Sequence, residues 1–210
     1  MNKLIKAFSL TIFLSICVFA QNSSDEYKRN EFYAGYSNQQ VDNFDRQSFN
    51  GFEAAYVRNI RRYVGIKGDF SAAYRKDDFE GNLPTLIPGG TVTSFRGKNT
   101  TSLYNFLGGV QIKDNASTAR FKPFAHALAG VAHIRNTSSI TCTSGNCSTS
   151  FTPGSFTFSD TGFSAALGGG LDVKINDKID FRLIQVDYNP IRTGGRFNNN
   201  VRFGIGFVFK

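Results

Sequence analysis

Apolar and polar residues alternate along much of this chain with a period of two, which is typical of a β-strand whose two faces meet different environments. In residues 64–74, Ile66 and Phe70 fall on one parity and Lys67 and Asp69 on the other. The same alternation recurs at 162–174 and 201–209, and more weakly at 31–41, 50–59, 101–112, 122–134 and 179–189. The pattern therefore predicts eight strands of about ten residues, the length with which a tilted strand crosses a bilayer.

The segments between these strands alternate between short and long. Short separators lie at 59–62, 113–121 and 176–178, and longer ones, rich in Asn, Ser, Thr, Gly and Pro, lie at 38–49, 75–99, 135–161 and 190–198. We expect short turns at one end and long irregular loops at the other. This arrangement is typical of an all-β, eight-stranded antiparallel up-and-down transmembrane barrel.

The composition of the two parities predicts which face points where. Eight strands enclose a space only wide enough for side chains, which suits small and mutually paired ionic residues better than a row of phenylalanines. We therefore expect a barrel-interior charge network of Glu53, Lys67, Asp69, Asp172, Lys174 and Arg202. The lipid-facing set is then Ile66, Phe70, Phe163, Leu167, Leu171, Phe203, Ile205, Phe207 and Phe209.

Two further features of the strands stay open at this stage. Arg182 and Asp187 have opposite parity in a regular strand, and a β-bulge could bring both inside. Seven tyrosines near strand ends or faces favour an interfacial aromatic girdle, although ordinary strand propensity also explains tyrosine in a sheet. They are Tyr33, Tyr36, Tyr56, Tyr63, Tyr74, Tyr104 and Tyr188.

Composition excludes a polytopic helical membrane protein. The 210 residues have a mean hydropathy of −0.24 and contain one long apolar run, Ala7 to Ala20. That run follows Lys3 and Lys6 and ends in Val18-Phe19-Ala20, so residues 1–20 are predicted to be a cleaved signal peptide. A buried N-terminal core helix is the alternative. Residues 21–210 are then the barrel domain.

Charge and cysteine content limit the kinds of binding partner and metal site that we expect. The net charge of +8 is spread along the chain, so we expect no nucleic-acid binding, whereas anionic lipid headgroups are a plausible neighbour. Cys142 and Cys147 lie in a small polar segment and predict a local disulfide in an oxidising compartment. His126 and His133 lie on another segment, so we expect no metal site and no cofactor.

Three segments of the chain resemble the small OmpA-like outer-membrane β-barrel family. They are Phe-Tyr-Ala-Gly-Tyr (32–36), Lys-Pro-Phe-Ala-His-Ala-Leu-Ala-Gly-Val (122–131) and Phe-Gly-Ile-Gly-Phe-Val-Phe (203–209). The resemblance implies the outer membrane of a Gram-negative-type bacterium, with outer-membrane lipids and the outer-membrane assembly machinery as partners. The C-terminal strand resembles the signal that this machinery reads, but Lys210 follows Phe209 where the pattern ends on the aromatic residue.

Some small barrels of this kind are lipid A enzymes that use a histidine, a serine and a carboxylate. Here the two histidines have opposite parities on one strand, and no serine motif accompanies either of them. We therefore expect no enzymatic activity and no catalytic residues, and interpret both histidines as satisfied strand residues.

The sequence accordingly predicts an integral outer-membrane barrel with a filled interior. Its expected role is envelope-structural or surface interaction through the long extracellular loops at 75–99 and 135–161. The alternatives are a low-conductance, porin-like pore and, less favoured because the chain has no Trp, a secreted soluble lipocalin-like binding barrel.

Overall fold

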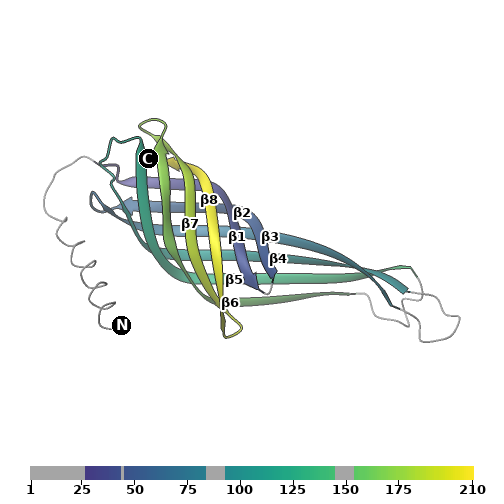
Figure 1. The fold of residues 1–210 in the computed structure, drawn as a ribbon. Coiled ribbons are helices and arrows are strands. Elements are labelled where there is room, and N and C mark those ends of the chain that lie inside the picture. Colours follow the sequence, from purple (N-terminus) through teal and green to yellow (C-terminus); the bar gives the residue numbers. More distant parts are fainter. Residues whose placement is uncertain (1–26, 44, 84–92, 145–153) are drawn as a thin grey trace, which may run out of the picture.

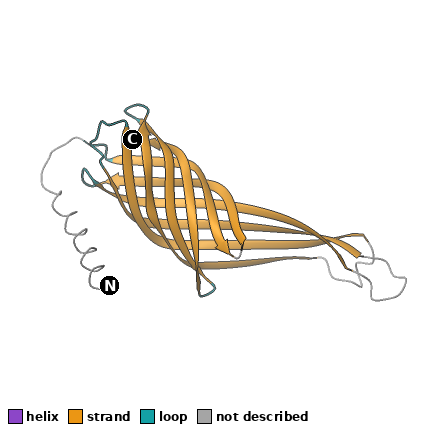
Figure 2. Ribbon diagram, in the orientation of Figure 1, coloured by secondary structure: helices purple, strands orange, loops and turns teal. Residues whose placement is uncertain are grey.

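The computed structural model describes residues 27–43, 45–83, 93–144 and 154–210, and these form a closed antiparallel barrel (Figures 1 and 2). Its eight strands are β1 (Asn30–Asn43), β2 (Asp45–Asn59), β3 (Val64–Leu83), β4 (Thr93–Lys113), β5 (Phe121–Ser144), β6 (Gly154–Lys174), β7 (Ile179–Thr193) and β8 (Arg196–Phe209). The expected fold class is confirmed. The expected signal peptide and Cys147 lie outside the described residues, so cleavage and the pairing of Cys142 with Cys147 stay predictions.

Each strand pairs with its sequence neighbour, and β1 pairs with β8 to close the ring. The turns at 60–63, 114–120 and 175–178 lie at one end of the barrel together with the C-terminus (Figure 2). We call this the short-turn end. In the part of the chain that the structure describes, no helix is long and apolar enough to cross a membrane.

Strand alternation separates the outer wall from the interior. The side chains of Ile66, Phe163, Leu167, Phe203, Ile205, Phe207 and Phe209 are exposed on the outer wall, and Phe70 and Leu171 are half-buried there. Of the seven tyrosines expected in a girdle, five also lie on this wall, Tyr36, Tyr56, Tyr74, Tyr104 and Tyr188, and Tyr63 is exposed in the turn at 60–63. Tyr33 is the exception: it is 1% exposed and packs inside with Ala55 and Val208. Its odd parity on β1 matches that of the interior positions Glu31 and Ser37, which explains the difference.

The strands are longer than the alternation predicts, which corrects the expectation of irregular loops. Most of 75–99 and 135–161 continues as strand, and β3 pairs with β4 as far as Leu83↔Thr93. β4 pairs with β5 out to Ser144, and β5 pairs with β6 out to Gly154. The outer halves of β3 to β6 thus form one four-stranded sheet that projects beyond the barrel (Figure 1), which we call the protruding sheet. The separators at 38–49 and 190–198 are likewise mostly strand.

The pairing of β1 with β8, which closes the barrel, requires glycine at one point. Gly35 and Gly206 lie directly opposite each other on β1 and β8. A Cβ atom on Gly206 would overlap the Cα of Gly35 and the carbonyl oxygen of Ala34. Because both overlaps are with backbone, the side chain could be accommodated only by separating the two strands.

We therefore expect Gly206→Ala to destabilise the folded barrel by about 1–3 kcal/mol, the usual cost of overpacking. The matched control is Gly68→Ala, since a Cβ on Gly68 would meet nothing within 4 Å. Urea unfolding in detergent micelles, followed by the heat-modifiable band on gels, measures both. Equal midpoints for the two variants would contradict this account of the closure.

Candidate functional site

Arg202 on β8 is the centre of a buried charge cluster in the barrel. Its Nη1 lies 2.8 Å from Asp69 Oδ1, its Nη2 lies 2.7 Å from Asp187 Oδ2, and its Nε lies 3.7 Å from Glu53 Oε2. All four side chains are buried and come from four different strands. Buried charges need partners because burial removes their hydration. The planar guanidinium fork suits this task, since it donates to several carboxylates at once.

Lys67 supplies the second cation of this central cluster. Its Nζ lies 3.1 Å from Asp69 Oδ2 and 3.3 Å from His126 Nδ1. An ammonium group can only donate, so Nδ1 is the acceptor and the other ring nitrogen, Nε2, carries the proton. Nε2 lies 2.8 Å from Asp187 Oδ1 and donates to it. This geometry selects one neutral tautomer of His126, in which the ring links Lys67 to Asp187.

A second buried cluster lies nearer the short-turn end. Lys113 Nζ lies 2.8 Å from Glu31 Oε2 and 3.0 Å from Asp172 Oδ2, and Arg182 Nε lies 2.8 Å from Asp172 Oδ1. The Arg182 guanidinium also lies over the rings of Tyr33 and Phe124, 4.3 Å and 3.9 Å from their centroids. Cation–π contact of this kind stabilises a desolvated arginine.

Gln185 joins the two clusters. It accepts a 2.7 Å hydrogen bond from Arg182 Nη1, and its Nε2 donates to Glu53 Oε1 and Asp187 Oδ2, both at 2.8 Å. One amide side chain therefore links the charges of both clusters into a single network.

A β-bulge on β7 explains why both Arg182 and Asp187 point inward. The register of β7 against β8 shifts between Arg182 and Gln185. Leu183 and Ile184 consequently both lie on the outer wall, 49% and 48% exposed, and the inward parity changes from even to odd. The sequence left this point open, and the bulge decides it.

The structure places five of the six expected interior charges together and separates the sixth. Glu53, Lys67, Asp69, Asp172 and Arg202 are buried in the network. Lys174 is not part of it: it lies at the end of β6, half-buried, and its Nζ pairs with Asp177 Oδ1 of the next turn at 2.6 Å. The reason is its position, since the strand leaves the barrel at this residue. Four further members of the network were not expected from the sequence: Glu31, Lys113, His126 and Gln185. Only the position of Glu31 has a simple signal, since it has the same parity on β1 as Tyr33, which also points inward.

Toward the protruding sheet the network continues as hydrogen bonds between uncharged amide side chains. Gln39 Nε2 donates to Asn189 Oδ1 at 2.7 Å, and Asn105 Nδ2 donates to Gln39 Oε1 at 3.3 Å. Beyond them Leu103, Ala132 and Ile191 form an apolar cluster with Ile134 packed against it. Polarity thus falls along the interior from ionic to amide to apolar.

The second histidine lies outside the network. His133 Nδ1 lies 2.7 Å from Thr161 Oγ1 on the outer wall, where the two residues are direct cross-strand neighbours. A hydroxyl next to an imidazole is the start of a nucleophilic site, but within the described residues no carboxylate hydrogen-bonds this ring. Those residues also contain no group of three or more His, Cys, Asp or Glu placed to hold a metal ion.

The protruding sheet has reversed polarity compared with the barrel wall. On the outer face of the wall β6 presents Phe163, whereas farther out the same face carries Ser155, Thr157 and Ser159. The opposite face, continuous with the barrel interior, carries exposed aromatic residues instead. They are Phe156, Phe158 and Phe79, at 63%, 65% and 44% exposure. The change of polarity marks where the apolar band of the wall ends.

Two glycines make room for aromatic rings on this side of the sheet. Phe79 and Phe95 lie directly opposite Gly97 and Gly81 respectively, and the two rings meet edge to face with centroids 6.4 Å apart. A Cβ on either glycine would overlap the facing ring. The glycines therefore let both rings lie flat on the sheet.

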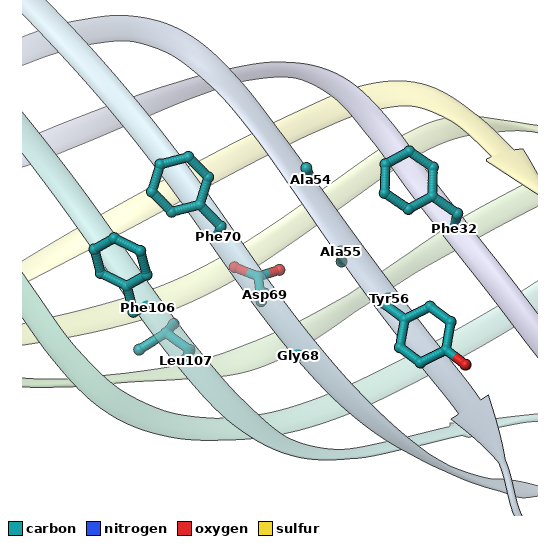
Figure 3. Close-up of a pocket in the computed structure, with 9 residues that line it drawn as sticks. All are labelled: Phe32, Ala54, Ala55, Tyr56, Gly68, Asp69, Phe70, Phe106 and Leu107. Atoms are coloured by element: carbon teal, nitrogen blue, oxygen red, sulfur yellow. The ribbon is translucent and has the colours of Figure 1, made fainter.

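The outer wall also has a shallow hollow between β1 and β4 (Figure 3). Phe32, Tyr56, Phe70 and Phe106 border it, and Gly68 leaves it open. Asp69 lies under this part of the wall with its carboxylate in the interior network. The apolar rings that border the hollow suit contact with acyl chains.

The comparisons with known proteins agree with this architecture. The family model described as outer membrane protein beta-barrel domain matches residues 10–209. Ail, the attachment invasion locus protein of Yersinia pestis, is similar in fold, with a TM-score of 0.53, 15% identity, and 86% of this chain and 97% of that chain covered. Neisserial surface protein A is also similar in fold, with a TM-score of 0.51 and 10% identity, and the match covers 88% of this chain and 99% of that chain. No curated protein sequence matches the chain.

The central cluster generates a stability prediction. Arg202→Met leaves three carboxylates facing one another around a single lysine, so we expect the free energy of unfolding to fall by about 3–5 kcal/mol. Arg135→Met is the control, because Arg135 is exposed on β5. Urea titration of both variants in the same detergent gives the comparison, and a small effect at Arg202 would show that the cluster does not hold the strands together.

Proposed function

Because this chain belongs to the outer membrane protein beta-barrel family, we propose that it is a non-conducting, non-enzymatic outer-membrane anchor that presents the protruding sheet to a surface partner. The short turns of such barrels face the periplasm and the longer connections face outward. The protruding sheet then stands outside the cell, and the barrel holds it in the bilayer. The expectation of a surface role stays, but a regular sheet replaces the irregular loops as its carrier.

The observation that carries this proposal is the difference between the two edges of the protruding sheet. β2 stops pairing with β3 at Tyr74, and β7 stops pairing with β6 at Ser164, so both edges continue without a partner strand among the described residues. The β3 edge carries Lys76, Asp78 and Glu80, and charges of this kind block the addition of a further strand. The β6 edge from 154 to 159 carries Ser, Thr and Phe and no charge.

The backbone of the β6 edge is oriented for strand addition. Lys174 N donates to Arg120 O across the β5–β6 ladder, and the register continues without a shift to Gly154. Even-numbered residues of β6 therefore bond to β5, and Ser155, Thr157 and Ser159 direct their N–H and C=O groups away from it. An extended peptide could pair with these groups while its side chains contact Phe156 and Phe158.

Charge on the outer face favours a peptide over a polyanion. Ail has been crystallised with the heparin analogue sucrose octasulfate, and such a ligand requires a positive surface. Here Arg96 pairs with Glu80 across the sheet, and Lys98 lies opposite Asp78. These pairs leave a face of mixed sign, so we propose an extended protein segment as the partner.

The interior and the wall support the rest of the proposal. Ionic, amide and apolar groups succeed one another along the interior, which favours a filled barrel over a pore. The outward rings of β8 suit acyl chains and recognition by the outer-membrane assembly machinery. A secreted lipocalin-like role has no support in a chain of this family.

A strand-addition experiment tests the partner surface. The probe is a fluorescein-labelled peptide of alternating valine and threonine, with binding to the detergent-solubilised protein followed by fluorescence anisotropy. Thr157→Pro removes one outward N–H and leaves the β5 bonds intact, so we expect peptide affinity to fall by about tenfold or more.

Asp78→Pro is the matched control for this experiment. Lys113 N donates to Tyr63 O across β3–β4, so Asp78 also directs its N–H to a free edge, but to the charged one. We expect this variant to bind the peptide as the unmodified protein does. Unchanged affinity in Thr157→Pro, or no binding by the unmodified protein, would refute the proposed edge.

Planar-bilayer recording tests the filled interior. We expect the purified protein to insert without discrete conductance steps, because ion pairs and apolar residues occupy the path between the two ends. Reproducible single-channel steps that disappear with heat-denatured protein would establish the pore alternative instead.

A further inference from the structure

The short-turn end of the barrel is strongly basic. Outside the buried clusters described above, its described cations are Lys28, Arg29, Arg58, Arg61, Arg62, Arg120, Lys122, Lys174, Lys178 and Lys210, and its acids are Asp114, Asp177 and Asp180. The acids are already paired: Asp114 with Arg62, Asp177 with Lys174, and Asp180 with Lys122 and Lys210. The remaining six cations are exposed, and none of them forms an ion pair with a carboxylate of the described residues.

Two arginines at this end are held beside tyrosine side chains, Arg58 beside Tyr56 of the outer wall and Arg62 beside Tyr63 of the adjoining turn. Arg58 Nη1 donates to Asn30 Oδ1 at 2.7 Å, and the Tyr56 hydroxyl donates to the same oxygen at 2.9 Å. The Arg62 guanidinium lies over the Tyr63 ring, 5.1 Å from its centroid. Tyrosine rings of membrane barrels lie at the level of the lipid headgroups. These contacts therefore place positive charge at headgroup depth, next to the wall.

We infer that the short-turn end binds the phosphate groups of anionic phospholipids in the adjoining bilayer leaflet. Charge complementarity carries the inference: the end has an excess of unpaired guanidinium and ammonium groups, and an arginine fork matches a phosphate in shape and charge. Arg58, Arg61 and Arg120 are the principal headgroup ligands, since all three are exposed and free of acidic partners among the described residues. The leaflet is the periplasmic one in the orientation proposed above, but the binding itself does not depend on the surface partner.

The chain contains no tryptophan, so a single introduced tryptophan reports on one place. Tyr63→Trp puts the reporter beside Arg62 in the basic end. The protein is reconstituted into phosphatidylcholine vesicles that contain either brominated phosphatidylglycerol or brominated phosphatidylcholine. Bromine quenches tryptophan on contact, so the ratio of quenching by the two lipids gives their relative affinity for this site.

We expect the anionic lipid to be preferred by about fivefold at low salt, which corresponds to the usual contribution of one basic residue at a membrane surface. The preference should approach unity in about 0.5 M sodium chloride, where the screening length is about 4 Å. Exchanging chloride for inorganic phosphate at constant ionic strength should leave it unchanged. Loss of the preference in phosphate would show a free-anion site and overturn the proposal.

Charge variants assign the effect to this end of the barrel. The triple variant Arg58→Gln, Arg61→Gln, Arg120→Gln should remove the preference measured by the introduced tryptophan. The matched control removes three cations from the protruding sheet, with Lys76→Gln, Lys98→Gln and Arg135→Gln, and should leave it intact. Equal quenching by both lipids before these charge substitutions, or a preference that survives in the first triple variant, would overturn the inference.

Discussion

A closed barrel in a bilayer leaves each side chain only two environments, and the rest of this structure depends on that constraint. Lipid cannot hydrogen-bond the backbone, so the strands must pair all the way round. Once the ring is closed, successive side chains face acyl chains or the interior. Phe203 and Phe207 then lie on the wall, and Arg202, on the opposite parity of the same strand, lies in the interior with three carboxylates. The ionic network is thus a consequence of closure as well as a support for it.

Where the same strands leave the membrane, the distribution of apolar and polar side chains over their two faces changes. Beyond the apolar band water surrounds both faces, so lipid no longer selects which face is apolar. In β6 the outer face changes from Phe163 to Ser and Thr, and the aromatic residues move to the other face. A sheet with one exposed aromatic face and one uncharged edge is costly to leave uncovered in water. The protruding sheet has such a face and such an edge on β6, whereas its β3 edge is protected by charge. This difference is the physical basis of the proposed partner surface.

We therefore propose different contacts for the two ends of the barrel. At one end the sheet offers backbone groups and rings, which suit an extended peptide. At the other, exposed arginines without carboxylate partners among the described residues, such as Arg58, suit lipid phosphates. Between them the interior side chains change from ionic to amide to apolar, and the one hydroxyl–imidazole contact among the described residues, His133 with Thr161, is a cross-strand neighbour pair on the wall.

The sequence by itself determined the fold class, because period-two alternation and the bilayer-length segments record the two environments of each strand directly. It also identified Glu53, Lys67, Asp69, Asp172 and Arg202 as a group, since parity is a local property. Only the tertiary structure decided what depends on pairing between distant strands. The bulge on β7 that turns both Arg182 and Asp187 inward, the place of Lys174 at the rim and the extension of β3 to β6 as a sheet all belong to this class. Asn and Gly in these segments have weak strand propensity of their own, and the neighbouring strand, which no local pattern reveals, holds the segments in the ladder.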